Sequence, residues 1–128
     1  MSELPREYVG WWRIVETSTW GIDMLDMIGP AVISITGRVD RLRMIALLAD
    51  VVWTPTTSGL SFRWTGAWEF DQLAGSGSVR LRKDGTLTGR FAITRGDKST
   101  FLAERTDPPA SPIPDPPSYR EKWGGRRW

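Results

Sequence analysis

The chain has 128 residues, eight of them tryptophan, with a formal net charge of +2 and neither cysteine nor histidine. A chain of this length fits one domain with a modest core. Without cysteine it has no disulfide, thiolate nucleophile or cysteine-bound metal, and without histidine it lacks the commonest general base and metal ligand. We therefore expect no cofactor, no metal ion and no catalytic residue, and the composition favours a protein that is not an enzyme.

The sequence also lacks the usual targeting and membrane-spanning signals. Residues 1–7 are polar and of mixed charge, unlike the apolar core of a signal peptide. No run approaches 18 apolar residues, the length that a transmembrane helix needs. These features predict a cytoplasmic protein.

The first half of the chain predicts a strand, a short helix and further strands. Residues 8–17 are rich in aromatic and β-branched side chains, which is typical of a strand. Residues 20–30 place apolar side chains at positions 22, 25, 27 and 28 and end at Gly29-Pro30, so we expect one or two helical turns. The apolar run over 42–53 is longer than a usual strand, and we expect it to break near Ala49-Asp50.

The second half alternates apolar and polar residues with the period of a strand. The alternation covers residues 60–66, 77–82, 87–94 and 100–105. Asp84-Gly85 and Gly96-Asp97 predict hairpin turns, and Gly75-Ser76-Gly77-Ser78 predicts a flexible turn. About eight short strands with one helix after the first predict an all-β fold. An antiparallel up-and-down barrel is favoured because closure removes exposed strand edges.

The composition changes after residue 106, which divides the chain into a barrel domain (1–106) and a tail (107–128). Six of the eleven residues 107–117 are proline, so neither a helix nor a β-ladder can persist, and we expect a disordered, extended tether. Its deletion should then leave the melting temperature nearly unchanged. The tail ends in basic and aromatic residues that we predict to dock on a partner: Tyr119, Arg120, Lys122, Trp123, Arg126, Arg127 and Trp128.

Four tryptophans are candidate ligand contacts. Trp20, Trp53, Trp64 and Trp68 could line a pocket for an apolar or aromatic ligand. They could equally fill the barrel, because eight strands leave just enough room for side chains. Trp68 is expected at the rim, and the sequence leaves the choice between a hollow and a filled barrel open.

Three groups of charged residues could form sites. Asp23 and Asp26 lie on one face of the expected helix, as a cation site would require, but acidic side chains near a helix start are the simpler interpretation. Asp50, Glu69 and Asp71 could form a carboxylate cluster, although nothing in the sequence brings them together. The outward-facing basic residues Arg80, Arg82, Lys83 and Arg90 could bind nucleic acid or an acidic partner. Cross-strand partners of opposite charge are the expectation there.

Two features resemble the calycin pattern shared by lipocalins, fatty-acid-binding proteins and avidins. One is Gly10-Trp11-Trp12 on the first strand, and the other is Arg105 on the last strand. The resemblance implies that Trp12 packs across the closed end of a barrel against Arg105.

Residues 10–106 also resemble a family of uncharacterised bacterial proteins. The matching motifs are Trp12-Arg13-Ile14, Trp20 through Ala31, Phe62 through Gly66, Asp84 through Arg90, and Phe101 through Arg105. Members often have more acidic residues where this chain has Ala67-Trp68. This resemblance implies no activity.

Together these features predict a non-enzymatic binding module of unknown ligand on a small calycin-like barrel. The ligand is a small apolar molecule or a partner protein, and nucleic acid is only weakly supported. The alternative is a structural or adaptor subunit that docks by its proline-rich tail and self-associates as a homo-oligomer.

Overall fold

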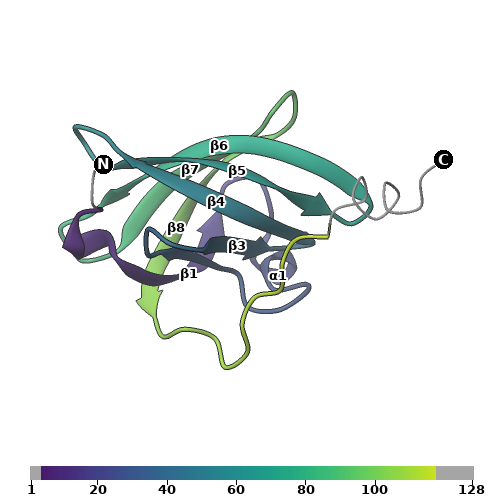
Figure 1. The fold of residues 1–128 in the computed structure, drawn as a ribbon, viewed down its shortest axis with the longest axis horizontal. Helices are drawn as coiled ribbons and strands as arrows, with labels where there is room; N and C mark the ends of the chain where they lie inside the picture. The colour runs from purple at the N-terminus through teal and green to yellow at the C-terminus, as the bar shows by residue number, and fades with distance from the viewer. Residues whose placement is uncertain (1–3, 118–128) are drawn as a thin grey trace.

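The structure, a computed structural model that describes residues 4–117, is a closed barrel of eight antiparallel strands (Figure 1). Each strand pairs with the next in the chain and β8 pairs with β1, so the order is up-and-down, as the sequence predicted. The strands are β1 (Gly10–Thr17), β2 (Val32–Ile35), β3 (Asp40–Met44), β4 (Leu47–Pro55), β5 (Leu60–Trp68), β6 (Asp71–Leu81), β7 (Leu87–Ile93) and β8 (Lys98–Thr106). A short 3₁₀ helix, η1 (Arg6–Tyr8), precedes β1, and the predicted helix, α1 (Ile22–Leu25), follows it.

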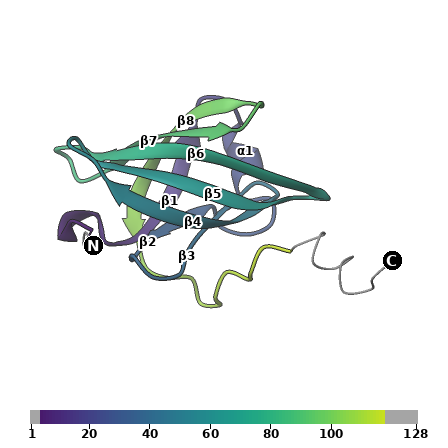
Figure 2. The same ribbon diagram turned by 45° about the horizontal axis from the view of Figure 1, so that its top comes forward.

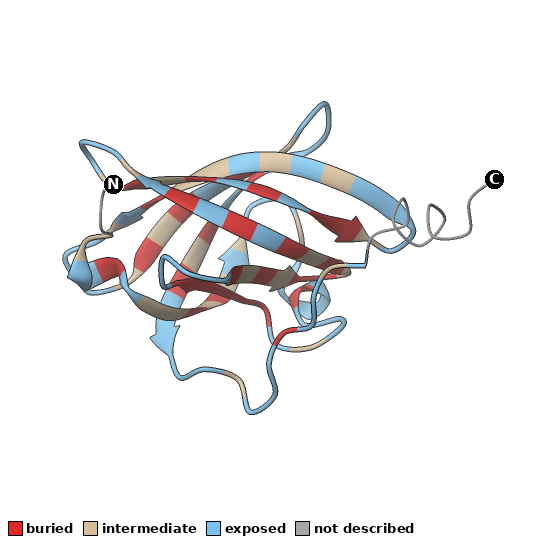
Figure 3. Ribbon diagram, viewed as in Figure 1, coloured by how far each residue is buried: buried red, intermediate tan, exposed pale blue. Residues whose placement is uncertain are grey.

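The core occupies the inside of the barrel. Buried and exposed residues alternate along β4 and β5, which Figure 3 shows as alternating bands. This alternation follows from the strand geometry, which sends successive side chains to opposite faces. Trp12 and Trp64 are among the largest fully buried side chains.

The predicted turns after β6 and β7 are present. Gly85 has a φ of +89°, a positive value that glycine adopts readily and that makes Asp-Gly a signal for a hairpin turn. The Thr86 hydroxyl donates to Asp84 Oδ1 at 2.6 Å, and this hydrogen bond holds the pKa of Asp84 below its ordinary value. The Asp84 carboxylate therefore braces the turn.

The apolar run breaks at Ile45-Ala46, and the predicted break at Ala49-Asp50 is wrong. Ile45 has a φ of +59°, and its N–H donates to the Leu25 carbonyl at 2.8 Å, which ties the β3–β4 turn to α1. Asp50 stays inside β4 because it faces outward, directly opposite Arg41 on β3. An outward carboxylate with a cationic neighbour is compatible with a strand.

The predicted flexible turn at 75–78 is also wrong, because these residues lie in the middle of β6. Gly75 and Gly77 face the rings of β5. A Cβ at position 77 would lie 2.3 Å from Phe62 Cζ, and one at position 75 would lie 2.6 Å from Trp64 Nε1. The glycines therefore make room for two aromatic rings.

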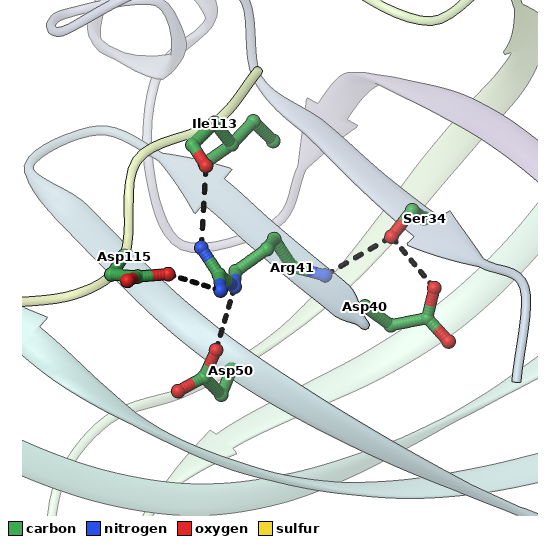
Figure 4. A network of polar contacts seen from close by, with 6 residues as sticks. All are labelled: Ser34, Asp40, Arg41, Asp50, Ile113 and Asp115. Carbon is green, nitrogen blue, oxygen red and sulfur yellow. Dashed lines mark hydrogen bonds and ion pairs between the residues drawn. The ribbon is translucent and has the colours of Figure 1, made fainter. Parts of the chain in front are cut away.

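Residues 107–117, which we call the strap, contain no helix or strand. The segment bows away from the barrel after β8 and returns to it beside Arg41 of β3 (Figures 1 and 4). Ile113 is only 6% exposed. Arg41 Nη1 donates to the Ile113 carbonyl at 3.2 Å, and Arg41 Nη2 pairs with Asp115. At the end of the strap, the Gln72 amide donates to the Pro117 carbonyl at 2.8 Å. This differs from the expected free tether; residues 118–128 lie outside the described residues.

Arg41 connects the strap to the sheet. Its Nε lies 2.6 Å from Asp50 Oδ1. This contact is an ion pair and not a hydrogen bond, because the Nε–H group has no hydrogen-bond acceptor among residues 4–117. Its backbone N–H donates to the Ser34 hydroxyl, which in turn donates to Asp40 (Figure 4). β2 and β3 share a short register, Val32↔Arg43 and Ile33↔Leu42. The strap is therefore held on the outside of β3 by Arg41.

Replacing Ile113 by alanine is expected to lower the free energy of unfolding by about 2 kcal/mol, because a buried aliphatic side chain is lost from the surface of the barrel. Denaturant unfolding monitored by tryptophan fluorescence measures this. Ser111→Ala, an exposed change in the same strap, is the control and should stay within about 0.5 kcal/mol. Deletion of residues 107–128 should also lower the melting temperature. An unchanged melting temperature would instead support the free tether predicted from the sequence.

Replacing Gly77 by alanine is expected to cost more than about 2 kcal/mol, because the new methyl group would overlap the Phe62 ring and the Arg90 carbonyl, 2.3 Å away. Thermal unfolding measured by circular dichroism tests this. The adjacent outward-facing change Ser76→Ala should be nearly neutral. Equal stability of the two variants would show that the ring has room to move.

Candidate functional site

Trp12 and Arg105, predicted as a closing pair, are brought together at one end of the barrel. They are register partners on β1 and β8, and Arg105 Cζ lies 4.3 Å from the centroid of the Trp12 ring. The indole N–H donates to the Tyr8 carbonyl at 2.9 Å. Arg105 donates to the carbonyls of Val9 and Glu7 at 2.9 and 2.7 Å. The pair therefore ties η1 across the barrel end.

Trp53 and Trp64 are buried in the interior of the barrel, and Trp64 also borders a hollow of about 360 Å³ that residues of β5 and β6 line. The Trp53 ring packs 4.8 Å from Phe62, and the Trp64 ring stacks 5.1 Å from Phe91, between centroids. Their indole N–H groups donate to the carbonyls of Ser34 and Ala92. Both rings are buried with their polar atoms satisfied, as core tryptophans require. For these two residues the structure favours the filled barrel.

Trp20 and Trp68 lie at the end of the barrel where β1 and β5 terminate. Their ring centroids are 5.7 Å apart, and Trp20 also lies 6.0 Å from Phe91. Thr17 fixes the backbone of Trp20, because its hydroxyl accepts a hydrogen bond from the Trp20 backbone N–H and donates one to the Trp20 backbone carbonyl. Both indoles are half-buried, which suits residues at a rim.

The segment after Trp20 leaves large apolar side chains in contact with solvent. Ile22 is 76% exposed and Met27 is 56% exposed, and Met24 and Ile28 are exposed as well. Of the apolar residues in 22–28, only Leu25 is buried. α1 is a single turn, within the one or two turns expected, and Leu25 is its buried residue.

We call this surface the apolar end. Its residues are Trp20, Ile22, Met24, Met27, Ile28 and Trp68. Figure 2 shows α1 and the β5–β6 hairpin toward the side of the barrel away from the N-terminus. Sequence reasoning found the two tryptophans and missed the methionines and isoleucines. A signal for their exposure was present in the sequence. Four large apolar residues lie in a segment that Gly29-Pro30 ends after about two turns, which is too short to bury all of them.

The carboxylate clusters that the sequence left as less favoured alternatives do not assemble. Asp26 accepts from the Ala31 N–H at 2.9 Å and pairs with Arg13, so it braces the loop after α1. Asp23 lies in the first turn of α1, as the simpler interpretation proposed. Asp50 pairs with Arg41 in the middle of β4, whereas Asp71 begins β6 beside Trp68. Within residues 4–117 no three carboxylates gather as a metal site would need.

The basic residues of β6 and β7 face outward beside hydroxyl groups. Arg90 lies between Ser78 and Thr100 in the register, and Arg80 lies beside Thr88. The expected cross-strand Glu or Asp partners are not found: no ion pair to Arg80, Arg82, Lys83 or Arg90 occurs in the described part of the chain.

No family model, curated protein or solved structure matches the chain. Among residues 4–117, no helix has both the length and the apolar character to cross a membrane.

Replacing Trp12 by alanine is expected to cost about 3–5 kcal/mol of stability, because a fully buried indole is removed. Arg105→Lys should cost about 1 kcal/mol, since one ammonium group cannot satisfy both carbonyls in the same geometry. Denaturant unfolding compares both variants with Arg38→Lys, an exposed change in the β2–β3 turn. A loss below about 1 kcal/mol for Trp12→Ala would rule out the core role.

Proposed function

We propose that the protein is a non-enzymatic, calycin-like binding module that holds a polypeptide partner at its apolar end. The observation that carries the proposal is the exposure of four large apolar side chains within residues 22–28, beside the Trp20–Trp68 pair. Several large apolar side chains left exposed within one short segment are typical of interaction sites. Methionine adds side chains that adapt to different partners.

The calycin-like part of the proposal is supported by the packing of Arg105 on Trp12. The resemblance expects such a contact at the closed end of a barrel, and this one lies where β1 begins and β8 ends. In such a barrel the opposite end is the one left for a ligand. Here α1, Trp20 and Trp68 lie at that opposite end.

A small apolar ligand inside the barrel is less well supported than a partner on its end. The rings of Phe62 and Trp64 press against the backbone of β6 so closely that Gly75 and Gly77 have no room for a Cβ. Trp53 and Phe91 occupy the space beside these rings. A ligand would have to displace the core, whereas a partner at the apolar end would cover surface that is already exposed.

The charges around the apolar end indicate the chemistry of the partner. Asp23 lies on α1, and Asp71 is the register partner of Trp68. Both are exposed. Two exposed carboxylates beside an apolar surface favour a segment that combines aromatic residues with lysine or arginine.

The chain itself contains such a sequence in residues 118–128, which hold Tyr119, Trp123 and Trp128 among four basic residues. They lie outside the described residues, so the predicted docking role of the tail stays a prediction. The strap ends at Pro117, which Gln72 binds one residue after Asp71. This contact favours the second candidate function, an adaptor whose tail sequence engages an apolar end on the same or another molecule.

The test is the affinity of the full-length protein for a fluorescein-labelled peptide with the sequence SYREKWGGRRW, measured by fluorescence anisotropy. The double variant Ile22→Ser/Met27→Ser should weaken binding at least tenfold, because two large apolar contacts are lost. Val52→Ser is the matched control, since Val52 is 68% exposed on the outside of β4. A peptide with its basic residues changed to glutamate should not bind.

Equal affinity of the double variant and the control would contradict the proposal. Sedimentation velocity of the same proteins tests the remaining alternative, in which the apolar end binds a second copy of the chain. If the wild-type particle is larger than a monomer and the double variant dissociates it without changing peptide affinity, the apolar end is a self-association surface.

A further inference from the structure

The outside of β6, β7 and β8 is hollowed into a groove of about 510 Å³. Its floor consists of the short side chains of Ser76, Ser78 and Ala92, and longer cationic side chains stand beside them. The outward lining residues are Ser18, Ser76, Ser78, Arg90, Ala92, Lys98 and Thr100. The hollow thus follows from the alternation of short and long side chains on the solvent face.

The strand register arranges these residues in rows across the sheet. One row runs from Ser61 through Ser78 and Arg90 to Thr100. The next row runs from Arg63 through Ser76 and Ala92 to Lys98. Neighbouring strands lie about 5 Å apart, so each cation has a hydroxyl within reach of the same small ligand.

Two further hollows extend this surface. One of about 330 Å³ shares Ser78, Arg90 and Thr100 and adds Arg80 and Thr88. Another of about 260 Å³ shares Thr100 and reaches Arg82, with Glu16 as its one carboxylate. Thr100 lines all three hollows and Arg90 lines two, which makes these residues the centre of the surface.

Arg80, Arg82, Arg90 and Lys98 form no ion pair within residues 4–117, although the charge of Arg82 is near enough to Asp84 to help lower the pKa of that carboxyl. The ion pairs there involve Arg13 and Arg41, on other strands. An ordinary solvated β-face would set opposite charges against each other in the register. Guanidinium groups beside hydroxyls instead offer several hydrogen-bond donors to one anion.

We infer that this groove binds a small ligand that carries two or more phosphate or sulfate groups, and that it is a second site apart from the apolar end. Arg90 and Lys98 supply the charge, and Ser78 and Thr100 supply neutral donors. The groove volume is that of a small-molecule site. Its one aromatic lining residue, Phe91, is buried, so there is no exposed ring on which the bases of a single-stranded nucleic acid could stack.

Isothermal titration of the full-length protein with inositol hexaphosphate and, separately, with sucrose octasulfate tests the inference and distinguishes phosphate from sulfate. Saturable binding of one equivalent is expected for at least one of them. Arg90→Gln should weaken that binding about tenfold or more, because charge-assisted hydrogen bonds are lost. Thr100→Val should weaken it severalfold without any change of net charge.

Arg38→Gln is the matched control, because it removes the same charge from the exposed β2–β3 turn. Equal losses in Arg38→Gln and Arg90→Gln would show attraction to net charge and overturn the inference, as would the absence of binding to both probes. Tighter binding of a twelve-residue oligothymidylate would also overturn it, in favour of nucleic acid. Arg90 and Thr100 are exposed, so their variants should fold, and melting temperatures check this.

Discussion

The contact between the aromatic rings of β5 and the glycines of β6 is the constraint on which the rest of this barrel depends. Phe62 and Trp64 lie against Gly77 and Gly75 so closely that no other residue type fits there. The rings therefore occupy the interior that a ligand-carrying barrel would keep open. Binding surfaces in this protein are consequently expected on its outside and at its end.

The same rings connect the core to the apolar end. Trp64 stacks on Phe91, Phe91 contacts Trp20, and Trp20 contacts Trp68. Close-packed rings transmit displacement because they have little free volume. A partner that moves Trp20 or Trp68 would therefore disturb buried tryptophan, which gives the proposed binding site an intrinsic fluorescence signal.

Two arginines attach segments that cannot join the sheet. Arg105 donates to the carbonyls of Glu7 and Val9 around η1, and Arg41 donates to the Ile113 carbonyl in the strap. A proline-rich segment offers carbonyl acceptors but few N–H donors, so a β-ladder cannot hold it. A guanidinium has five donors and suits that task. The composition of the strap thus excludes regular structure without excluding a fixed position.

The sequence by itself determined the strands, most of their turns and the closed barrel, because alternation and Asp-Gly turns are local signals. The contact between Trp12 and Arg105 was also expected, but only because the sequence resembles the calycin pattern. Only the tertiary structure decided what depends on distant neighbours. Gly75 and Gly77 belong to a strand because rings from β5 need their space, and the break falls at Ile45 because its N–H binds α1. The strap lies on the barrel because Arg41, far away in sequence, binds Ile113 and Asp115. Four of the five apolar residues of 22–28 remain exposed because a single helical turn has only one side against the barrel, the side of Leu25.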